Sequence, residues 1–345
     1  MSLNPLPLTM RAVGINKYGD IDAIEDLTLP VPQPNPNEIL VKVEYGGVNW
    51  LDMGYRSGTV PFPSPPPPKP LGGEAAGTIV SLPTDEGVLS DEQYRARGFH
   101  VGGKVAIWGN GAFAEYISAP WTNVFSIPDG VSTRDGAASM IQGFSALVLM
   151  SEAYNVQPGD RVLVHTVAGG MGLCFAQLIA ARGATVIGTT STPEKAEIAK
   201  AHGAAHVILY KQEDVVKRVL ELTDGKGVDA IFDGVGKDTF ESDLKMIRKR
   251  GTIVGYGTIS GPLPPFDLRR FMQKNVKFTY ATAMLYAEDP KEAREWFEGV
   301  FRLVADGTLK MRIHAEYPFT AQGVQKSQTD MVNGTSVGKL LIKIA

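Results

Sequence analysis

The twelve residues RVLVHTVAGGMG at 161–172 decide the fold of this chain. The run RVLVHTV is rich in β-branched residues and follows the turn signature QPGD at 157–160, so it predicts a buried strand. The glycines of AGGMG come next, and an apolar helical stretch then extends to Arg182. A buried strand that passes through a glycine loop into a helix is the pattern of a dinucleotide-binding βαβ unit.

The glycine loop fits this pattern at two of its three glycine positions. Val167 stands where the strict G-x-G-x-x-G pattern has its first glycine, whereas Gly169 and Gly172 stand at the second and third. The second glycine lets the backbone approach a pyrophosphate, and the third lets helix and strand pack closely. The unpaired N–H groups at the start of the helix favour phosphates as well. The residues expected at this site are Ala168, Gly169, Gly170, Met171 and Gly172.

Strand-like runs alternate with helical stretches as far as residue 256. This alternation predicts consecutive βαβ units, and therefore an α/β fold with a doubly wound parallel sheet of the Rossmann type. The predicted strands span 185–190, 206–210, 228–233 and 251–256, and the predicted helices span 194–202, 212–222 and 238–249.

The rest of the sequence has a different character. Up to about Pro128, short alternating runs are broken by Gly and Pro, which predicts a β-rich domain. The proline-dominated stretch at 61–70 predicts a stiff, extended surface loop beside a binding cleft. The polar segment 84–99 predicts an exposed excursion between strands. The C-terminal part adds a predicted strand near 275–281, an amphipathic helix at 290–305 and a strand at 339–344.

Length and composition limit the classes of protein to consider. The 345 residues suffice for two domains, and a net charge of −3 argues against a main role in binding nucleic acid or an acidic membrane. No apolar run approaches a membrane span, and the start of the chain lacks the pattern of a signal peptide. One cysteine excludes an internal disulfide framework and suits a reducing compartment. These features predict a soluble, cytoplasmic protein.

The end of the second predicted strand indicates which dinucleotide is bound. NAD sites place an Asp or Glu there, which accepts hydrogen bonds from the ribose hydroxyls. Here the residues are Thr190, Ser191 and Thr192, and Lys195 follows. Tyr210, at the end of the third predicted strand, adds a further hydroxyl donor. These hydroxyl groups and the cation predict a site for a 2′-phosphate, and therefore NADPH as the cofactor.

With these residues in view, nearly the whole chain resembles the zinc-free quinone oxidoreductases, the zeta-crystallin branch of the medium-chain dehydrogenase/reductase superfamily. The segments that carry the resemblance are GVNWLD at 47–52 with YRSG at 55–58, GGEAAG at 72–77, VAGGMG at 167–172, GKGVD at 225–229, DGVGKDT at 233–239 and VGKLL at 337–341. Zinc-dependent members carry a Cys and a His where this chain has Asn49 and Gly73, and the only cysteine here is Cys174. Catalytic zinc needs about three protein ligands, so no metal is expected.

The resemblance implies two domains and a homodimer. A GroES-like, β-rich catalytic domain would comprise 1–133 and 282–345, and a Rossmann domain at 134–281 would bind NADPH. The cleft between the two domains would hold the cofactor and the acceptor. The homodimer would form through the edge strands of the Rossmann sheets, which correspond here to 274–281.

The resemblance also assigns further contacts residue by residue. Asn49 would lie near the nicotinamide and its ribose, and Ser145 near the nicotinamide phosphate. The groove at the carboxyl ends of the fourth and fifth strands would be lined by Val235, Tyr256, Gly257 and Thr258. Two positions depart from the family pattern, because Asn333 replaces an Arg that contacts the 2′-phosphate in many relatives, and Gly54 replaces a Tyr.

The family implies that NADPH reduces a quinone or another conjugated carbonyl, by electron or hydride transfer without zinc. Hydrogen bonds would then stabilise the developing charge on oxygen, and a proton would come from a side chain or from solvent. The candidate catalytic residues are Asn49, Tyr55 and Asp52, of which Asp52 is expected to fix a nearby loop. Two alternatives stay open: a reductase of enones or alkenals, and a non-catalytic protein that binds NADPH or RNA.

Overall fold

The computed structural model describes residues 6–60 and 62–345, and the chain divides into two compact units. The first unit contains the chain up to Ile141 together with Asp289–Gly307 and Ile313–Ala345. The second unit contains Gln142–Glu288 and Thr308–Arg312. No helix among the described residues is long and apolar enough to cross a membrane. The domain limits and roles expected from the sequence stay predictions.

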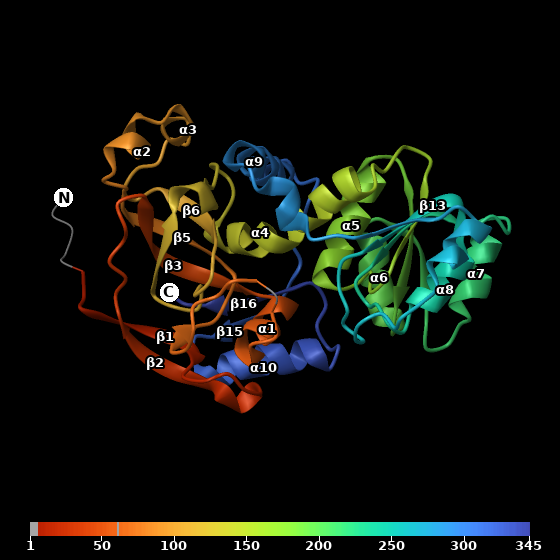
Figure 1. The fold of residues 1–345 in the computed structure, drawn as a ribbon, viewed down its shortest axis with the longest axis horizontal. Helices are drawn as coiled ribbons and strands as arrows, with labels where there is room; N and C mark the ends of the chain where they lie inside the picture. The colour runs from red at the N-terminus through yellow and green to blue at the C-terminus, as the bar shows by residue number, and fades with distance from the viewer. Residues whose placement is uncertain (1–5, 61) are drawn as a thin grey trace. The chain divides into compact units, whose positions relative to one another are not determined.

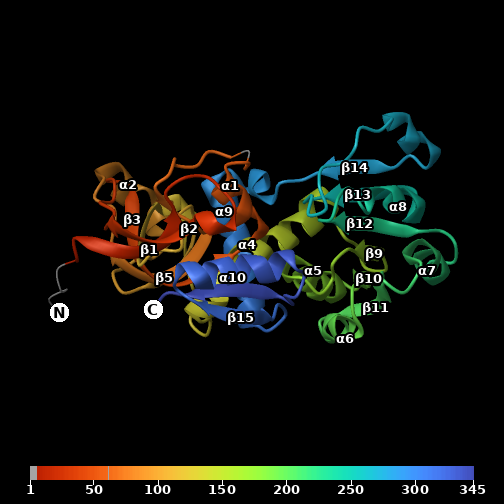
Figure 2. The same ribbon diagram turned by 90° about the horizontal axis from the view of Figure 1, so that it is seen from below.

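The second unit is built around a six-stranded sheet in which all neighbouring strands are parallel. The strand order β11-β10-β9-β12-β13-β14 is that of a Rossmann fold, which confirms the predicted sheet. Helices α5 and α6 lie on one side of the sheet, and α7 and α8 lie on the other (Figures 1 and 2). The strands are β9 (Arg161–Val164), β10 (Thr185–Thr190), β11 (Ala204–Leu209), β12 (Val228–Asp233), β13 (Ile247–Gly255) and β14 (Lys277–Tyr280), and the helices are α5 (Gly170–Ala181), α6 (Pro193–Ala201), α7 (Val215–Leu222) and α8 (Phe240–Met246).

Apolar side chains from the strands of this sheet form the core of the second unit. Leu163, Ile187 and Ile231 lie at the centres of adjacent strands and are at most 1% exposed. Because parallel strands are covered on both faces, near-continuous runs of such residues are what this sheet requires. The carboxyl ends of β9, β10, β12 and β13 consequently meet at one edge of the sheet, from which the loops predicted to bind the cofactor begin.

The first unit contains a seven-stranded sheet and a three-stranded sheet. Its core includes Val41, Val43 and Ile107, and α10 contacts both β2 and β15 (Figure 2). The strands are β1 (Thr9–Ile15), β2 (Ile24–Pro30), β3 (Glu38–Val48), β4 (Lys69–Pro70), β5 (Glu74–Ser81), β6 (Lys104–Trp108), β7 (Tyr116–Pro120), β8 (Val124–Ser126), β15 (Ile313–Pro318) and β16 (Lys339–Lys343). The helices are α1 (Trp50–Ser57), α2 (Glu86–Ser90), α3 (Glu92–Arg95), α9 (Pro290–Ala305) and α10 (Ala321–Val332), and α4 (Thr133–Val148) begins in this unit and ends in the second.

The structure departs from the sequence prediction in several places. The helix predicted at 238–249 ends at Met246, because the chain enters β13 at Ile247, which pairs with Val228 of β12. The strand predicted at 161–167 ends at Val164, because Thr166 has a φ of 52° and the chain leaves the sheet there. The segment 84–99 contains α2 and α3 and is not wholly exposed, since Tyr94 and Arg97 are buried. Of the proline-dominated stretch, Pro61 lies outside the described residues, and its last two residues form β4, in which Lys69 is buried.

Candidate functional site

The glycine loop after β9 has the geometry that a close approach of backbones requires. Gly169 is the N-cap of α5, and a Cβ atom at Gly172 would lie 2.6 Å from the Cα of Val167. Only glycine therefore allows α5 to pack this closely against the end of β9. A Cβ atom at Gly170 would overlap the side chain of Gln142, whose Oε1 is buried without a hydrogen-bond donor among the described residues. The start of α5 thus combines unpaired N–H groups with an unused acceptor nearby.

The loop after β10 gathers positive charge and hydroxyl groups. Thr192 is the N-cap of α6 and accepts a hydrogen bond from the N–H of Lys195 at 3.4 Å. Burial lowers the pKa of Lys195, and the positive charge of Lys211 lowers it further. An anion between two such lysines would relieve their repulsion. Glu194, the carboxylate next to this site in the chain, is exposed and interacts with Thr192.

The remaining residues predicted for the 2′-phosphate lie at the same strand ends. Thr190 is the last residue of β10 and is buried, and its carbonyl accepts from the N–H of Tyr210 at 3.1 Å. Ser191 follows Thr190 and is half-buried, whereas Tyr210 is 49% exposed. Thr190, Ser191, Lys195 and Tyr210 therefore lie around the ends of two paired strands. Lys211 belongs with them and was missed, although it directly follows Tyr210 in the sequence.

The loops after β12 and β13 are held together by hydrogen bonds. The carboxylate of Asp233 accepts from the N–H of Val235 at 2.7 Å, and the carbonyl of Asp233 accepts from the N–H of Tyr256 at 2.9 Å. A Cβ atom at Gly257 would lie 2.8 Å from the carbonyl oxygen of Gly234, so these loops are in close contact. The structure thus brings together the four residues predicted here, Val235, Tyr256, Gly257 and Thr258. Ser145 lies half-buried on α4, three residues after Gln142.

In the first unit, Asn49 belongs to a buried polar cluster. Its amide nitrogen donates to Oε1 of Glu74 at 2.7 Å, and its amide oxygen accepts from Nζ of Lys339 at 2.8 Å. Lys339 also forms an ion pair with Glu74, in which both side chains are 0% exposed, and donates to the carbonyl of Val48 at 3.0 Å. The N–H of Ile141 donates to Oε2 of Glu74 at 2.6 Å. Glu74 and Lys339 thus fix the orientation of the Asn49 amide.

Asp52 and Tyr55 lie on α1, which Asn49 precedes. Oδ2 of Asp52 accepts from the N–H of Asn49 at 2.7 Å, whereas its buried Oδ1 has no hydrogen-bond donor among the described residues. Burial raises the pKa of Asp52 to about 7, against the lowering effects of the Asn49 N–H and Lys339. Burial and the charge of Asp52 also raise the pKa of Tyr55. Asp52 is therefore a carboxyl group that exchanges a proton near neutral pH.

The residues of this cluster do not fit a catalytic zinc ion. The side chain of Asn49 is an amide that is already bonded to Glu74 and Lys339, and Gly73 has no side chain. The ammonium group of Lys339 adds a positive charge where a cation would have to bind. Zinc prefers Cys, His and carboxylate ligands, about three of which are needed at a catalytic site.

The second unit holds a group of titratable residues that the sequence analysis missed. One ligand-type atom from each of His165, Asp233 and Asp243 lies within 4.8 Å of the others, and all three residues are buried. His165 follows β9, Asp233 ends β12 and Asp243 lies on α8, so only the fold brings them together. The signal in the sequence was Asp243, an acidic residue between Phe240 and Met246 on the otherwise apolar face of α8.

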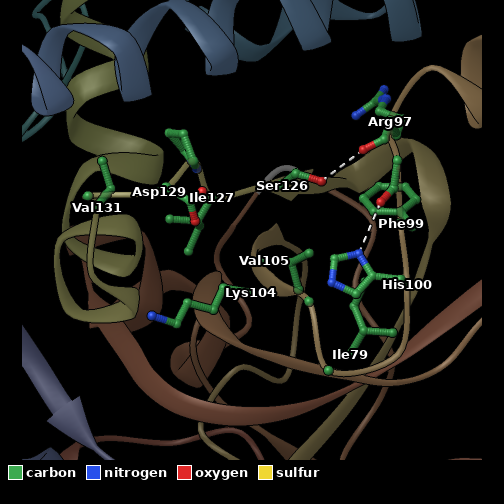
Figure 3. A pocket seen from close by; sticks show the side chains of 15 residues that line it. Ile79, Arg97, Phe99, His100, Lys104, Val105, Ser126, Ile127, Asp129 and Val131 are labelled. Atoms are coloured by element: carbon green, nitrogen blue, oxygen red, sulfur yellow. Dashed lines mark hydrogen bonds between the residues drawn. The ribbon is translucent and has the colours of Figure 1, made fainter.

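A separate cavity lies in the first unit, lined by the segment that leads into β6 and the segment that follows β8 (Figure 3). Its volume is about 380 Å³, and Arg97, His100, Lys104 and Asp129 are among the residues that line it. The hydroxyl of Ser126 donates to the carbonyl of Arg97 at 3.0 Å at its rim. None of the residues predicted for the active site lines this cavity.

Comparisons with known proteins find relatives that match nearly the whole chain. The profile of the alcohol dehydrogenase GroES-like domain matches residues 35–129, and that of the zinc-binding dehydrogenases matches residues 170–299. A quinone oxidoreductase of Pseudomonas aeruginosa is 32% identical over 328 residues, which are 94% of this chain and 97% of that protein. A 2-haloacrylate reductase of Burkholderia sp is 32% identical over 319 residues, 90% of this chain and 92% of that protein. The crystal structure of Escherichia coli quinone oxidoreductase complexed with NADPH has a TM-score of 0.88 and 29% identity, with 96% of this chain and 99% of that one covered.

Proposed function

The chain belongs to the zinc-free quinone oxidoreductases of the medium-chain dehydrogenase/reductase superfamily, and we propose that it reduces quinones with NADPH. The observation that carries the cofactor assignment is the end of β10. There the positive charge of Lys211 lowers the pKa of Lys195, and the hydroxyl groups of Thr190–Thr192 replace the usual acid. Two cations with several hydroxyl donors suit a 2′-phosphate and not a pair of ribose hydroxyls.

Three groups of residues would hold the cofactor, all of them in the second unit except Asn49, which belongs to the first. Ala168, Gly169, Gly170, Met171 and Gly172 would bind the pyrophosphate, since the start of α5 offers N–H groups and a positive dipole. Thr190, Ser191, Lys195 and Tyr210, with Lys211, would bind the 2′-phosphate. The nicotinamide side would be lined by Asn49, Ser145, Val235, Tyr256, Gly257 and Thr258. The bound cofactor supplies the electrons for the reduction, as a hydride or singly.

The catalytic groups that we propose supply hydrogen bonds and a proton. Reduction of a quinone to a quinol places negative charge on an oxygen atom, which needs a donor and a proton. Asp52 has its pKa near 7 and an unpaired Oδ1, so it can hold that proton at neutral pH. Tyr55 is the tyrosine of α1, and its hydroxyl would donate a hydrogen bond to the oxygen atom of the quinone. Asn49 would act mainly by position, because both ends of its amide are bonded to Glu74 and Lys339.

A second candidate function is the reduction of enones or alkenals on the same site. The observation that favours it is the 2-haloacrylate reductase of Burkholderia sp, which has the same 32% identity to this chain as the quinone oxidoreductase of Pseudomonas aeruginosa, over a slightly shorter stretch of 319 against 328 residues. Both reactions would use the same cofactor site, and both require a proton donor. The two reactions differ in the size and shape of the molecule that is reduced, so a test has to compare a quinone with a small alkenal.

We also propose a homodimer that forms through the edge strand β14. This strand pairs with β13 on one side only, and its neighbourhood exposes Met272 (72%), Leu268 (69%) and Tyr280 (53%). Exposed apolar side chains beside an open strand edge favour association with a second edge. Sedimentation of the purified chain should give the mass of a dimer, and a Tyr280→Lys variant should shift it toward the monomer. A single cysteine cannot form a disulfide within the chain, which supports our assignment to the reducing cytoplasm.

The function can be tested by following the loss of NADPH absorbance after an acceptor is added. Rapid oxidation with phenanthrenequinone and slow oxidation with a small alkenal would support the quinone reductase. Turnover with the alkenal alone would move the protein to the second function. Tight NADPH binding without turnover of either acceptor would instead indicate a non-catalytic binding protein.

A further inference from the structure

The buried group of His165, Asp233 and Asp243 connects two loops to which we assign the cofactor. His165 follows β9 and Asp233 ends β12, while Asp243 lies on α8. Their exposed fractions are 3%, 3% and 0%. One ligand-type atom of each lies within 4.8 Å of the others. The proposed reaction uses none of these three side chains, so their burial at this place needs a separate explanation.

The hydrogen bonds around His165 can run in one consistent direction. The N–H of Thr166 donates to Oγ1 of Thr189 at 3.3 Å, and this oxygen lies 3.0 Å from Nδ1 of His165. The hydroxyl hydrogen of Thr189 is then available to Nδ1, which leaves Nε2 of His165 protonated. Nε2 lies 2.9 Å from Oδ1 of Asp243 and donates to it. In this direction every buried polar atom from Thr166 to Oδ1 of Asp243 has a partner.

The two carboxyl groups of the cluster differ in their partners. Asp233 accepts from the N–H of Val235 at 2.7 Å, from the N–H of Gly236 at 3.2 Å and from the hydroxyl of Thr239 at 2.8 Å. These donors stabilise Asp233 as an anion. Oδ2 of Asp243 is buried and has no donor among the described residues, and Asp233 acts on this carboxyl as a hydrogen-bond partner and as a like charge. A proton between the two groups would satisfy Oδ2 and remove the repulsion of two buried anions.

We propose that Asp243 is a positioning residue for cofactor binding, which in its protonated form donates to Asp233 through Oδ2 and accepts from His165 through Oδ1. The hydrogen-bonded chain then extends from Thr166 in the glycine loop to Gly236 in the loop after β12. One buried carboxyl group therefore fixes the two loops relative to each other. This inference rests on the proposed function, because it concerns the loops to which we assign NADPH.

Two alternatives, a proton on His165 or a bound divalent cation, leave the polar atoms of this cluster with poorer partners. If the proton lay on His165 instead, Oδ2 of Asp243 would lack a donor and would face the Asp233 anion. A divalent cation would have three ligands here, whereas a structural zinc takes four. The oxygens of Asp233 already accept three hydrogen bonds, which a bound cation would have to displace in part.

The arrangement makes the two loops sensitive to pH. Burial and the charge of Asp233 raise the pKa of Asp243 to about 6, and an ionised Asp243 raises the pKa of His165 against the effect of burial. The cluster therefore holds a proton that it releases as the pH rises above about 6. Tyr256 is the other titratable neighbour of Asp233, and it stays neutral because burial and Asp233 raise its pKa. Loss of the cluster's proton removes the Asp243–Asp233 bond, so NADPH affinity falls as pH rises.

The test compares Asp243→Asn, Asp243→Ala and the wild-type chain. The amide of the Asn variant reproduces the protonated carboxyl, since its nitrogen donates to Asp233 and its oxygen accepts from His165. We expect the Asn variant to bind NADPH within about twofold of wild type at pH 6 and to keep that affinity in alkali, whereas wild type loses up to about tenfold per pH unit above its midpoint. The cofactor's own phosphate titrates equally in both proteins and cancels. The Ala variant should bind weakly at every pH.

Two measurements without cofactor separate this inference from the proposed function. The melting temperature of wild type should fall with rising pH relative to the Asn variant, whether or not NADPH is the ligand. In wild type labelled at its five histidines, the nitrogen shifts should identify His165 as a neutral Nε2–H imidazole at neutral pH. An imidazolium at His165, an Asn variant with the wild-type pH profile, or one divalent metal ion per chain would each overturn the assignment. Failure of wild type to bind NADPH would instead refute the proposed function.

Discussion

Removal of the ammonium group of Lys339 should destabilise the first unit by an amount that the structure allows us to work out. Lys339→Met keeps most of the apolar stem of the side chain but deletes three hydrogen bonds, to Val48, Asn49 and Glu74. The carboxylate of Glu74 would stay fully buried without its counter-charge. Loss of one partner of a buried ion pair costs about 3–5 kcal/mol, because the remaining charge stays desolvated.

We expect a value near the lower end of that range, about 3 kcal/mol, because Glu74 keeps two N–H donors, from Asn49 and Ile141. Glu74→Gln removes the charge and keeps an acceptor oxygen for one of these two donors. The double variant should therefore be more stable than the sum of the single changes implies, by about 2 kcal/mol.

The assay is urea unfolding of the wild-type chain, both single variants and the double variant, with the free energy of unfolding compared in a double-mutant cycle. The kinetic readout on the same proteins is kcat, which should fall in Lys339→Met because the Asn49 amide loses one of its two anchors. A cost below about 1 kcal/mol for Lys339→Met would refute the reasoning, and so would additive single changes. Either result would mean that the pair is not buried and coupled as described.

Four further outcomes are expected. If protonated Asp52 delivers the proton, kcat should fall by up to about tenfold per pH unit above pH 7, and Asp52→Asn should be slow and independent of pH. Burial raises the pKa of Asp52 above its unfolded value, so the ionised carboxylate destabilises the fold increasingly as the pH rises from about 4 to 7. Asp52→Asn should therefore melt at a higher temperature than wild type at pH 8 but not at pH 4. Equal melting curves at pH 8 would contradict this. Gly172→Ala should destabilise the second unit by about 2 kcal/mol or more and abolish NADPH binding, because its Cβ would lie 2.6 Å from Val167. The comparison variant Gly169→Ala meets its nearest atom at 3.2 Å and should cost much less, as measured by urea unfolding. Lys211→Ala should weaken the binding of NADPH but not that of NADH, as measured by a titration of intrinsic fluorescence. The control is Lys217→Ala, which removes an exposed lysine. Equal effects on both cofactors would mean that Lys211 does not contact the 2′-phosphate.

The sequence predicts the parallel sheet well because its signals are local. The strands at 185–190 and 228–233 and the helix at 290–305 have the predicted limits. Each is a run whose apolar pattern and flanking turn residues lie within a few positions. The end of β9 was misjudged because a β-branched run continues past it, while Thr166 takes a left-handed backbone that no propensity favours.

The buried polar clusters could not be predicted because their members are far apart in the chain. Lys339 lies 265 residues from Glu74, and Asp243 lies 78 residues from His165. A charged residue in an apolar strand, such as Lys339 in β16, shows that a partner is needed but not which one. The two short helices α2 and α3 could have been predicted, since Asp85 and Asp91 stand at their N-caps.

The measurement that tests the central claim most directly is a single turnover of the purified chain with phenanthrenequinone, started from NADPH in one experiment and from NADH in the other. We expect rapid oxidation of NADPH and much slower oxidation of NADH, with Lys195→Ala slowing only the NADPH reaction at subsaturating cofactor. A faster reaction with NADH, or a Lys195→Ala variant that keeps its preference for NADPH, would contradict the assignment of the 2′-phosphate to the end of β10.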